Sequence, residues 1–484
     1  MDIKLNKLFF IFSIFSIHLV PFGKNISFET FPILILLMVI YLFFIRGINL
    51  KYYFENNQII ILIISILIFT YLINFWEQNN KFIELIKYLI GPIILLFFID
   101  LKKYFGLNEI LIFGLGIILL YLIFFFRVPV IFGLTCNTLE FFIGRLDCSH
   151  SANLIRPFLI TPEPSYLALM LSFYLIVLNY FKKNMLNKNK KNFYLAIEIS
   201  ICYIIFVTSS RAGLLFLLIY IFYKIFSYKI YKNIYFLLSL LCFSTFIIFF
   251  SNLNILKTTE TYYKDGIINS RNILNIDFII HRFINKKLLR DIECDLVKDE
   301  EIYFTGEYIE SVGIEERKLL LLQTNEKCYV KNDLLSVINV SEPTGFVRII
   351  HNYLSFKGSL KNNFVGHGLG SYSEMWYLHA ETFNVRHLIK TNEVMQKWYP
   401  DIENKKQHVQ NYFFSILHDG GIIPAILILI LILNSLKIII KNKFTFGYII
   451  LSYVVLTFFF QSAITSPYPW MALGLMLFNN KRYA

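Results

Sequence analysis

Long apolar runs, separated by short polar segments, dominate the hydrophobic pattern of this chain. The runs are about 17–25 residues long, the length that an α-helix needs to cross about 30 Å of hydrocarbon. We therefore predict an all-α polytopic membrane protein with about twelve transmembrane helices. The predicted spans are residues 8–22, 29–46, 59–76, 84–100, 108–126, 164–181, 193–209, 212–227, 233–251, 411–436, 444–462 and 467–479.

One long polar segment interrupts this pattern before the last three predicted spans. Loops of this length are usually functional or folded in their own right. The pattern divides the chain into an N-terminal transmembrane bundle of about nine helices (1–251), a large loop (252–410) and C-terminal transmembrane helices (411–484). Within the loop, Arg348 begins an apolar-periodic segment that predicts an amphipathic helix along the membrane surface.

Charge placement sets the predicted topology. The net charge is +13, but most of the basic excess lies in short loops between spans or near the ends of spans, including Lys182, Lys183, Lys224 and Lys437. Basic residues concentrate in cytoplasmic loops of membrane proteins, so both termini are predicted to be cytoplasmic. The loops 127–163 and 252–410 then lie outside the cytoplasm. The charge therefore indicates membrane topology and gives no sign of a nucleic-acid partner.

The cysteines fit an oxidising location for these two loops. Cys136 and Cys148 share one outer loop, and Cys294 and Cys328 share the other, so each pair is a candidate disulfide. The alternative is four free thiols. The spacing of Cys and His residues does not match a zinc site, and we expect no metal and no cofactor.

Two short motifs at the outer face could carry chemistry. Glu163 lies between two prolines at the start of a predicted span, where it is either an acid/base group or an ordinary helix-capping carboxylate. Arg211 lies between two predicted spans in the sequence Ser-Ser-Arg-Ala-Gly. Its guanidinium either binds a phosphate through paired hydrogen bonds or extends to the membrane interface without a functional role.

The end of the large loop is the third candidate. Gly368 and Gly370 belong to the sequence Gly-His-Gly-Leu-Gly, which follows no predicted strand and lies away from nucleotide pools. We predict a tight turn that permits close backbone approach. His408 stands three residues before Asn411 at the start of a predicted span, and it is either a base or a structural histidine. Other histidines of this loop compete for the role: His351, His367, His379 and His387.

Taken in order, these motifs resemble the superfamily of O-antigen polymerases and ligases (Wzy-type and WaaL-type). The resemblance covers most of the chain: about twelve spans, a large outer loop before the last three, the motif at Arg211, Arg348 before the glycine-rich run, and the segment 408–421. It implies a GT-C-like membrane glycosyltransferase in which Arg211 and Arg348 bind the diphosphate of an undecaprenyl-linked glycan and His408 is the base. Gln410, rather than His, precedes Asn411, which departs from the family pattern.

The resemblance implies a polymerase of bacterial O-antigen or capsule in the inner membrane. It would transfer the growing glycan from undecaprenyl diphosphate to a lipid-linked repeat unit. Gly368, Gly370 and Asn411 are further substrate-binding candidates, and Glu163 is the alternative acid/base group. A chain-length regulator and a flippase are expected partners besides membrane lipid. A ligase that passes finished glycan to lipid A core is the nearest alternative, and a lipid-linked oligosaccharide transporter is the alternative of another class.

Overall fold

The computed structural model describes residues 7–8, 10–11, 14–15, 57–73, 82–125, 164–182, 188–208, 210–227, 343–390, 392, 395, 407, 409, 411–460 and 466–478. Within these residues every regular element is helical and no strand occurs, which confirms the all-α prediction. The chain divides into two compact units. The first comprises residues 1–72, 78–250 and 426–484, and the second comprises 73–77 and 251–425.

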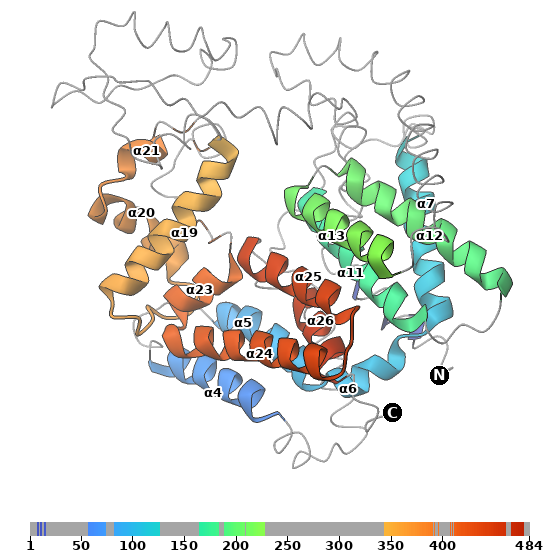
Figure 1. Ribbon diagram of the computed structural model, residues 1–484. Coiled ribbons are helices and arrows are strands. Elements are labelled where there is room, and N and C mark those ends of the chain that lie inside the picture. The colour runs from blue at the N-terminus through green and yellow to red at the C-terminus, as the bar shows by residue number, and fades with distance from the viewer. Residues whose placement is uncertain are drawn as a thin grey trace, which may run out of the picture. The chain divides into compact units, whose positions relative to one another are not determined.

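The structure contains helices in both units, and Figure 1 labels the α-helices. Those of the first are α4 (Gln58–Ile73), α5 (Phe82–Leu96), α6 (Phe98–Leu101), the short 3₁₀ helix η2 (Lys102–Tyr104), α7 (Leu107–Phe125), α11 (Pro164–Lys182), α12 (Lys188–Val207), α13 (Arg211–Ser227), α25 (Gly447–Phe460) and α26 (Tyr468–Leu477). Those of the second are α19 (Pro343–Lys361), α20 (Tyr372–Thr382), α21 (Arg386–Lys390) and α23 (Tyr412–Asp419). The sequence of α24 (Ile422–Lys441) begins in the second unit and continues in the first.

Most described helices of the first unit, and α24, overlap predicted spans, but few helices are both long and apolar enough to cross a membrane. By length and composition α24 can cross a membrane, and a second candidate arises if α5 and the segment Phe98–Tyr104, bent by 66°, form one span. The apolar segments of the other candidate helices are 10–17 residues long, which is shorter than this test requires. The described residues therefore show a helical protein with at least one helix of membrane-spanning length, and the count of about twelve stays a prediction.

The run predicted as one span at 411–436 is broken into two helices. α23 ends at Asp419, α24 begins at Ile422, and Gly421 between them has φ +89°. A positive φ does not fit a continuous right-handed helix, and glycine adopts it without steric cost. The helix of membrane-spanning length therefore begins at Ile422 rather than at residue 411.

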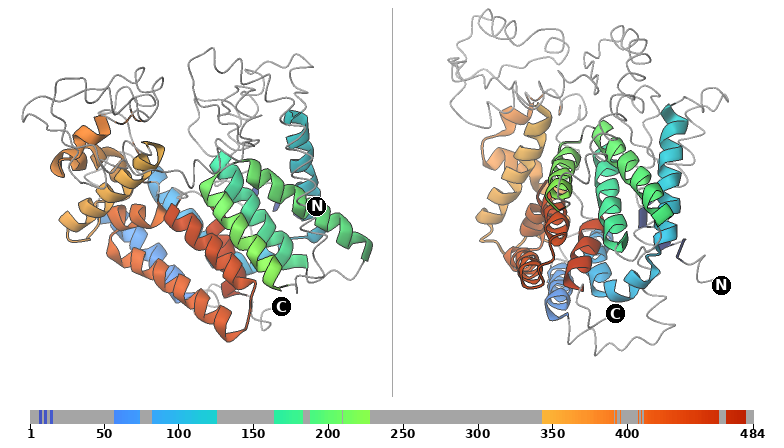
Figure 2. Two further views of the ribbon diagram at one scale, coloured as in Figure 1. Left: turned by 45° about the horizontal axis from the view of Figure 1, so that its top comes forward. Right: turned by 45° about the vertical axis from the view of Figure 1, so that its right-hand side comes forward.

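α11 forms the centre of the first unit. Its residues 167–178 are buried all round the helix, as expected for a helix surrounded by other helices. It contacts α7, α12, α13, α25 and α26, and Figures 1 and 2 show α11, α12 and α13 side by side. Gly213 allows α13 to approach closely, because a Cβ there would lie 2.6 Å from the Cβ of Ala168. Gly213, two residues after Arg211, therefore has a role in helix packing.

A buried ion pair joins two helices of this unit. The Lys224 Nζ atom of α13 lies 2.6 Å from Oε1 of Glu198 in α12, and it also donates to Oδ1 of Asn179 in α11 at 2.6 Å. The Tyr220 hydroxyl donates to the same Glu198 oxygen. Glu198 is fully buried and Lys224 nearly so. The three central helices α11, α12 and α13 are thus joined by polar as well as apolar contacts.

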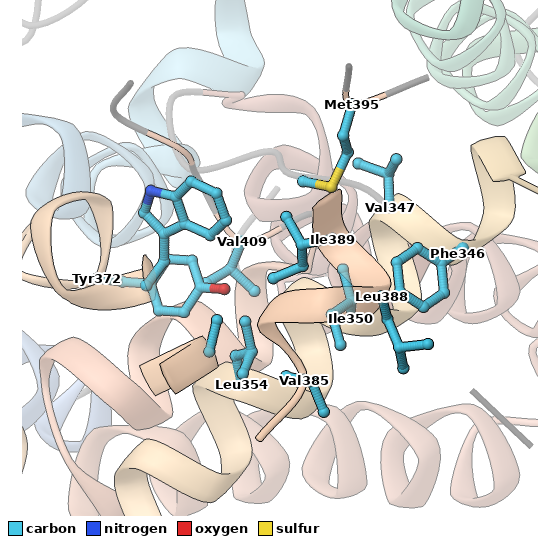
Figure 3. Close-up of a cluster of buried hydrophobic side chains, with 12 residues drawn as sticks. Phe346, Val347, Ile350, Leu354, Tyr372, Val385, Leu388, Ile389, Met395 and Val409 are labelled. Carbon is cyan, nitrogen blue, oxygen red and sulfur yellow. The ribbon is translucent and has the colours of Figure 1, made fainter. Parts of the chain in front are cut away.

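The second unit is built on α19, the amphipathic helix predicted to begin at Arg348. The helix in fact begins at Pro343, and Phe346, Ile350 and Leu354, spaced four residues apart, are fully buried on one face. They pack in a core with residues of α20, α21 and the chain around them, namely Tyr372, Trp376, Ala380, Val385, Leu388, Ile389, Met395 and Val409. Figure 3 shows the side chains of α19 and of the α21 region pointing into this core.

Candidate functional site

Two glycine-containing turns of the second unit pack backbone against backbone. The first is the glycine turn, residues 366–370, and the second is the 420–421 junction between α23 and α24. His367 N donates to His418 O at 2.9 Å and Gly368 N donates to Asp419 O at 3.0 Å. A Cβ on Gly366 would lie 2.8 Å from Gly421 N, so no larger side chain fits this contact. The predicted close backbone approach is therefore present, and its partner is another part of the same chain.

Asp419 is the hydrogen-bonding centre of this region. Its Oδ2 accepts from Gly370 N at 2.9 Å, and its Oδ1 accepts from Ser371 Oγ and Tyr372 N at 3.1 Å each. Oδ1 also lies 2.8 Å from Nδ1 of His418. The carboxylate thus sits at the N-terminus of α20, where free N–H groups and the helix dipole favour a negative charge. One buried side chain fixes the glycine turn, the start of α20 and the ring of His418.

Three histidines converge beside Asp419. His379 Nε2 lies 2.9 Å from His418 Nε2, and the ring of His367 stacks on that of His418 with centroids 4.3 Å apart and planes 8° apart. One ring nitrogen of each histidine lies within 4.8 Å of the others. His379 and His418 are buried, whereas His367 is partly exposed. We call His367, His379 and His418 the histidine cluster.

Burial makes two members of the histidine cluster weak bases. Burial, together with the neighbouring His418, lowers the pKa of His367 from 6.5 to about 4 and that of His379 to about 3. Both imidazoles are therefore neutral at pH 7. A neutral imidazole has one nitrogen with a free lone pair, which can accept a proton or bind a metal ion.

The space around the histidine cluster is shaped by neighbouring small and aromatic residues. Gly358 of α19 makes room for His379, because a Cβ there would lie 2.6 Å from His379 Nε2. The ring of Tyr372 meets His418 edge-on, with centroids 5.2 Å apart. The hydroxyl of the same tyrosine bonds to Nδ1 of His351 at 2.8 Å. The cluster is therefore enclosed by α19, α20 and α23.

The predicted loop residues have mixed positions relative to the histidine cluster. Gly368 and Gly370 are adjacent to it, but their N–H groups already donate to Asp419. Asn411 is the N-cap of α23, and its Oδ1 accepts from Phe414 N at 3.1 Å. Arg348 is exposed on α19, while its neighbours Val347 and Ile350 are buried. The glycines and Asn411 thus form hydrogen bonds within the second unit, whereas Arg348 is exposed.

Several predicted residues cannot be compared with this geometry. Arg211 is the first residue of α13 in the other unit, where only its backbone is described. Glu163, His408 and the four loop cysteines (Cys136, Cys148, Cys294 and Cys328) lie outside the described residues. The roles assigned to them stay predictions.

Sequence reasoning did not find the histidine cluster. The relevant signal was the His-Asp-Gly-Gly sequence at 418–421, which places a hydrogen-bonding pair directly before a helix break. His367 and His379 lie 51 and 39 residues from His418. Rules for zinc-site spacing describe ligands that are close together in sequence. They do not detect histidines that only the packing of distant segments brings together.

The backbone contact between the turns leads to a stability prediction. Gly421→Ala is expected to destabilise the protein by about 2 kcal/mol or more, because alanine is strained at this positive φ. Its Cβ would also lie 2.5 Å from Val365 O. Thermal unfolding of the purified protein in detergent measures the effect. Gly116→Ala in α7, where a Cβ meets nothing within 4 Å, is the control and should not lower the unfolding temperature. Equal stability of the two variants would contradict the prediction.

Comparisons of the chain with protein-family models, with curated proteins and with solved structures give no match.

Proposed function

We propose that this chain is an integral-membrane glycosyltransferase that polymerises a bacterial surface polysaccharide, O-antigen or capsule. In this proposal the growing glycan leaves undecaprenyl diphosphate and is joined to the non-reducing end of an incoming lipid-linked repeat unit. The reaction takes place outside the cytoplasm, in an inner-membrane protein of about twelve spans. The ligase that transfers finished glycan would use the same residues, and the outer-loop motif at Glu163 favours the polymerase.

The placement of Arg348 is the observation that carries the proposal. Its guanidinium is exposed, while the opposite face of α19 is held in the core of the second unit. A rigid helix thus presents a permanent positive charge with five N–H donors, which suits two phosphate oxygens better than lysine does. Among the described residues no carboxylate forms an ion pair with Arg348. It is therefore available to an anionic ligand.

The proposed chemistry requires charge stabilisation at the leaving group and a base at the acceptor. When the glycosidic bond to the lipid diphosphate breaks, negative charge develops on the departing oxygen, and Arg348 and Arg211 would stabilise it. His408 would accept the proton of the attacking sugar hydroxyl, with Glu163 as the alternative base. Later in the chain, α24 is long and apolar enough to cross the membrane that holds the lipid carrier.

Arg348→Ala is expected to reduce polymerisation at least about 100-fold, because removal of one preorganised donor to a developing negative charge costs this much in other enzymes. The assay follows elongation of lipid-linked repeat units by purified protein, resolved as a ladder on a gel. Arg348→Lys should retain part of the activity, since it keeps the charge but not the two parallel hydrogen bonds.

Lys361→Ala provides the matched control, because Lys361 is an exposed cation at the end of the same helix. It should polymerise at the parental rate. Arg348→Ala at the parental rate would rule out the proposed role. In a deletion strain, surface glycan limited to single repeats indicates a polymerase, whereas accumulated long lipid-linked chains indicate the ligase.

A further inference from the structure

The histidine cluster has the composition of a transition-metal site. Three imidazoles come from three separate segments, the glycine turn, α20 and α23, and one nitrogen of each lies within 4.8 Å of the other two. We propose that His367, His379 and His418 bind one Zn²⁺ ion, with Asp419 orienting His418. This site is separate from the diphosphate-binding role proposed for Arg348, and it does not depend on the proposed function.

The arrangement of Asp419 supports the proposal. Histidines that bind zinc almost always donate their second ring N–H to a carboxylate or carbonyl, which fixes the tautomer and the ring orientation. His418 Nδ1 lies 2.8 Å from Asp419 Oδ1, so Nε2 of His418 keeps its lone pair. That Nε2 atom faces Nε2 of His379. Asp419 is itself held by three other donors, so the ring of His418 is oriented before any ion binds.

The pair formed by His379 and His418 needs only a small adjustment to bind an ion. Zn–N distances of about 2.0–2.1 Å in a tetrahedral site place two ligand nitrogens about 3.3 Å apart. The two Nε2 atoms are now 2.9 Å apart. An increase of a few tenths of an ångström, with the proton of His379 moved from Nε2 to Nδ1, therefore converts a hydrogen-bonded pair into a pair of metal ligands.

His367 must turn to complete the site. A metal ion binds in the plane of an imidazole ring, and the stacked rings of His367 and His418 lie in nearly parallel planes. Rotation about the Cβ–Cγ bond of His367 aims its ring at the ion, and this torsion has a broad energy profile. The ring is partly exposed, and its contact from Nδ1 to His418 O is long, at 3.4 Å. Rotation of the ring replaces this contact and the stacking on His418 with a bond to the ion.

The ligand types of the cluster also suit Zn²⁺. Three imidazole nitrogen ligands with one nearby carboxylate favour Zn²⁺ over Mg²⁺ and Ca²⁺, which prefer oxygen ligands. Three protein ligands leave a fourth position for water, as in zinc sites that are not purely structural.

The test measures metal binding rather than activity. Full-length protein in detergent is treated with a chelator, titrated with Zn²⁺ by calorimetry, and analysed for bound metal by mass spectrometry. We expect one Zn²⁺ per chain, unaffected by millimolar Mg²⁺. His379→Gln and His418→Gln should each weaken binding at least about 100-fold, because removal of a first ligand costs more than the 10–100-fold loss typical of residues that orient ligands.

His351→Gln is the control, because it removes a buried histidine of the same unit that lies outside the cluster. It should bind Zn²⁺ like the parent. Co²⁺ added to the parent protein should give the visible absorption of a four-coordinate site, a readout that does not require any variant to fold. Absence of stoichiometric Zn²⁺ and of this Co²⁺ spectrum would overturn the proposal and show a hydrogen-bonded cluster only. Zn²⁺ binding equal in the parent and in folded His379→Gln would overturn it as well.

Discussion

Asp419→Ala is expected to destabilise the second unit by more than about 3 kcal/mol, since each buried donor left unsatisfied costs about 1–3 kcal/mol. The carboxylate is 3% exposed and has four donor partners. Alanine leaves Gly370 N, Ser371 Oγ and Tyr372 N without their acceptor. The start of α20 would also lose the negative charge that its dipole favours. Limited proteolysis and thermal unfolding of the purified protein measure the loss.

Two further variants separate this effect from general sensitivity of the region. Asp419→Asn keeps one oxygen acceptor and should lie between the parent and the alanine variant. Glu381→Ala removes an exposed carboxylate of α20 that pairs with Arg386 at 2.8 Å. Exposed ion pairs contribute about 0–1 kcal/mol, so this variant should unfold close to the parent. If Asp419→Ala were as stable as Glu381→Ala, the central role of Asp419 would be wrong.

The helices could be predicted because their cause is local. An apolar run long enough for hydrocarbon, or an apolar period of about 3.6 residues as in α19, is visible in the sequence itself. The break between α23 and α24 was missed because the run 411–436 is apolar on both sides of it. What ends α23 is the backbone contact of Gly421 with Val365 and Phe364, about fifty-five residues earlier in the chain.

The candidate site was only partly predictable for the same reason. The glycine turn was expected to approach a backbone closely, but its partner, the 420–421 junction, is set by tertiary packing. His367 and His379 were considered as separate alternatives for a base, and His418 was not among them. Their convergence depends on hydrogen bonds between the turn and α23, which no spacing rule contains. Arg348 was easier to single out, because a charged residue within an apolar periodicity is a local feature.

Lys224 has a structural role that its position in the sequence did not reveal. It was counted with the basic residues that mark the cytoplasmic side, and this use needs only its position along the chain. In the structure it lies within α13, and its ammonium contacts Glu198 and Asn179. A charge buried among apolar helices is costly unless its oppositely charged partner is present. The pair therefore favours the packing of α12 against α13 that keeps Glu198 and Lys224 in contact.

Lys224→Met is therefore expected to destabilise the first unit by about 3–5 kcal/mol, because it leaves the buried Glu198 carboxylate without its cation. The double variant Lys224→Met with Glu198→Leu should recover a large part of this loss, since no isolated charge stays buried. Unfolding of the purified protein in detergent measures both. Lys103→Ala, which breaks an exposed pair with Asp100 at 2.7 Å, is the control and should cost less than about 1 kcal/mol. A Lys224→Met protein as stable as this control, or a double variant less stable than either single variant, would show that the pair does not hold these helices together.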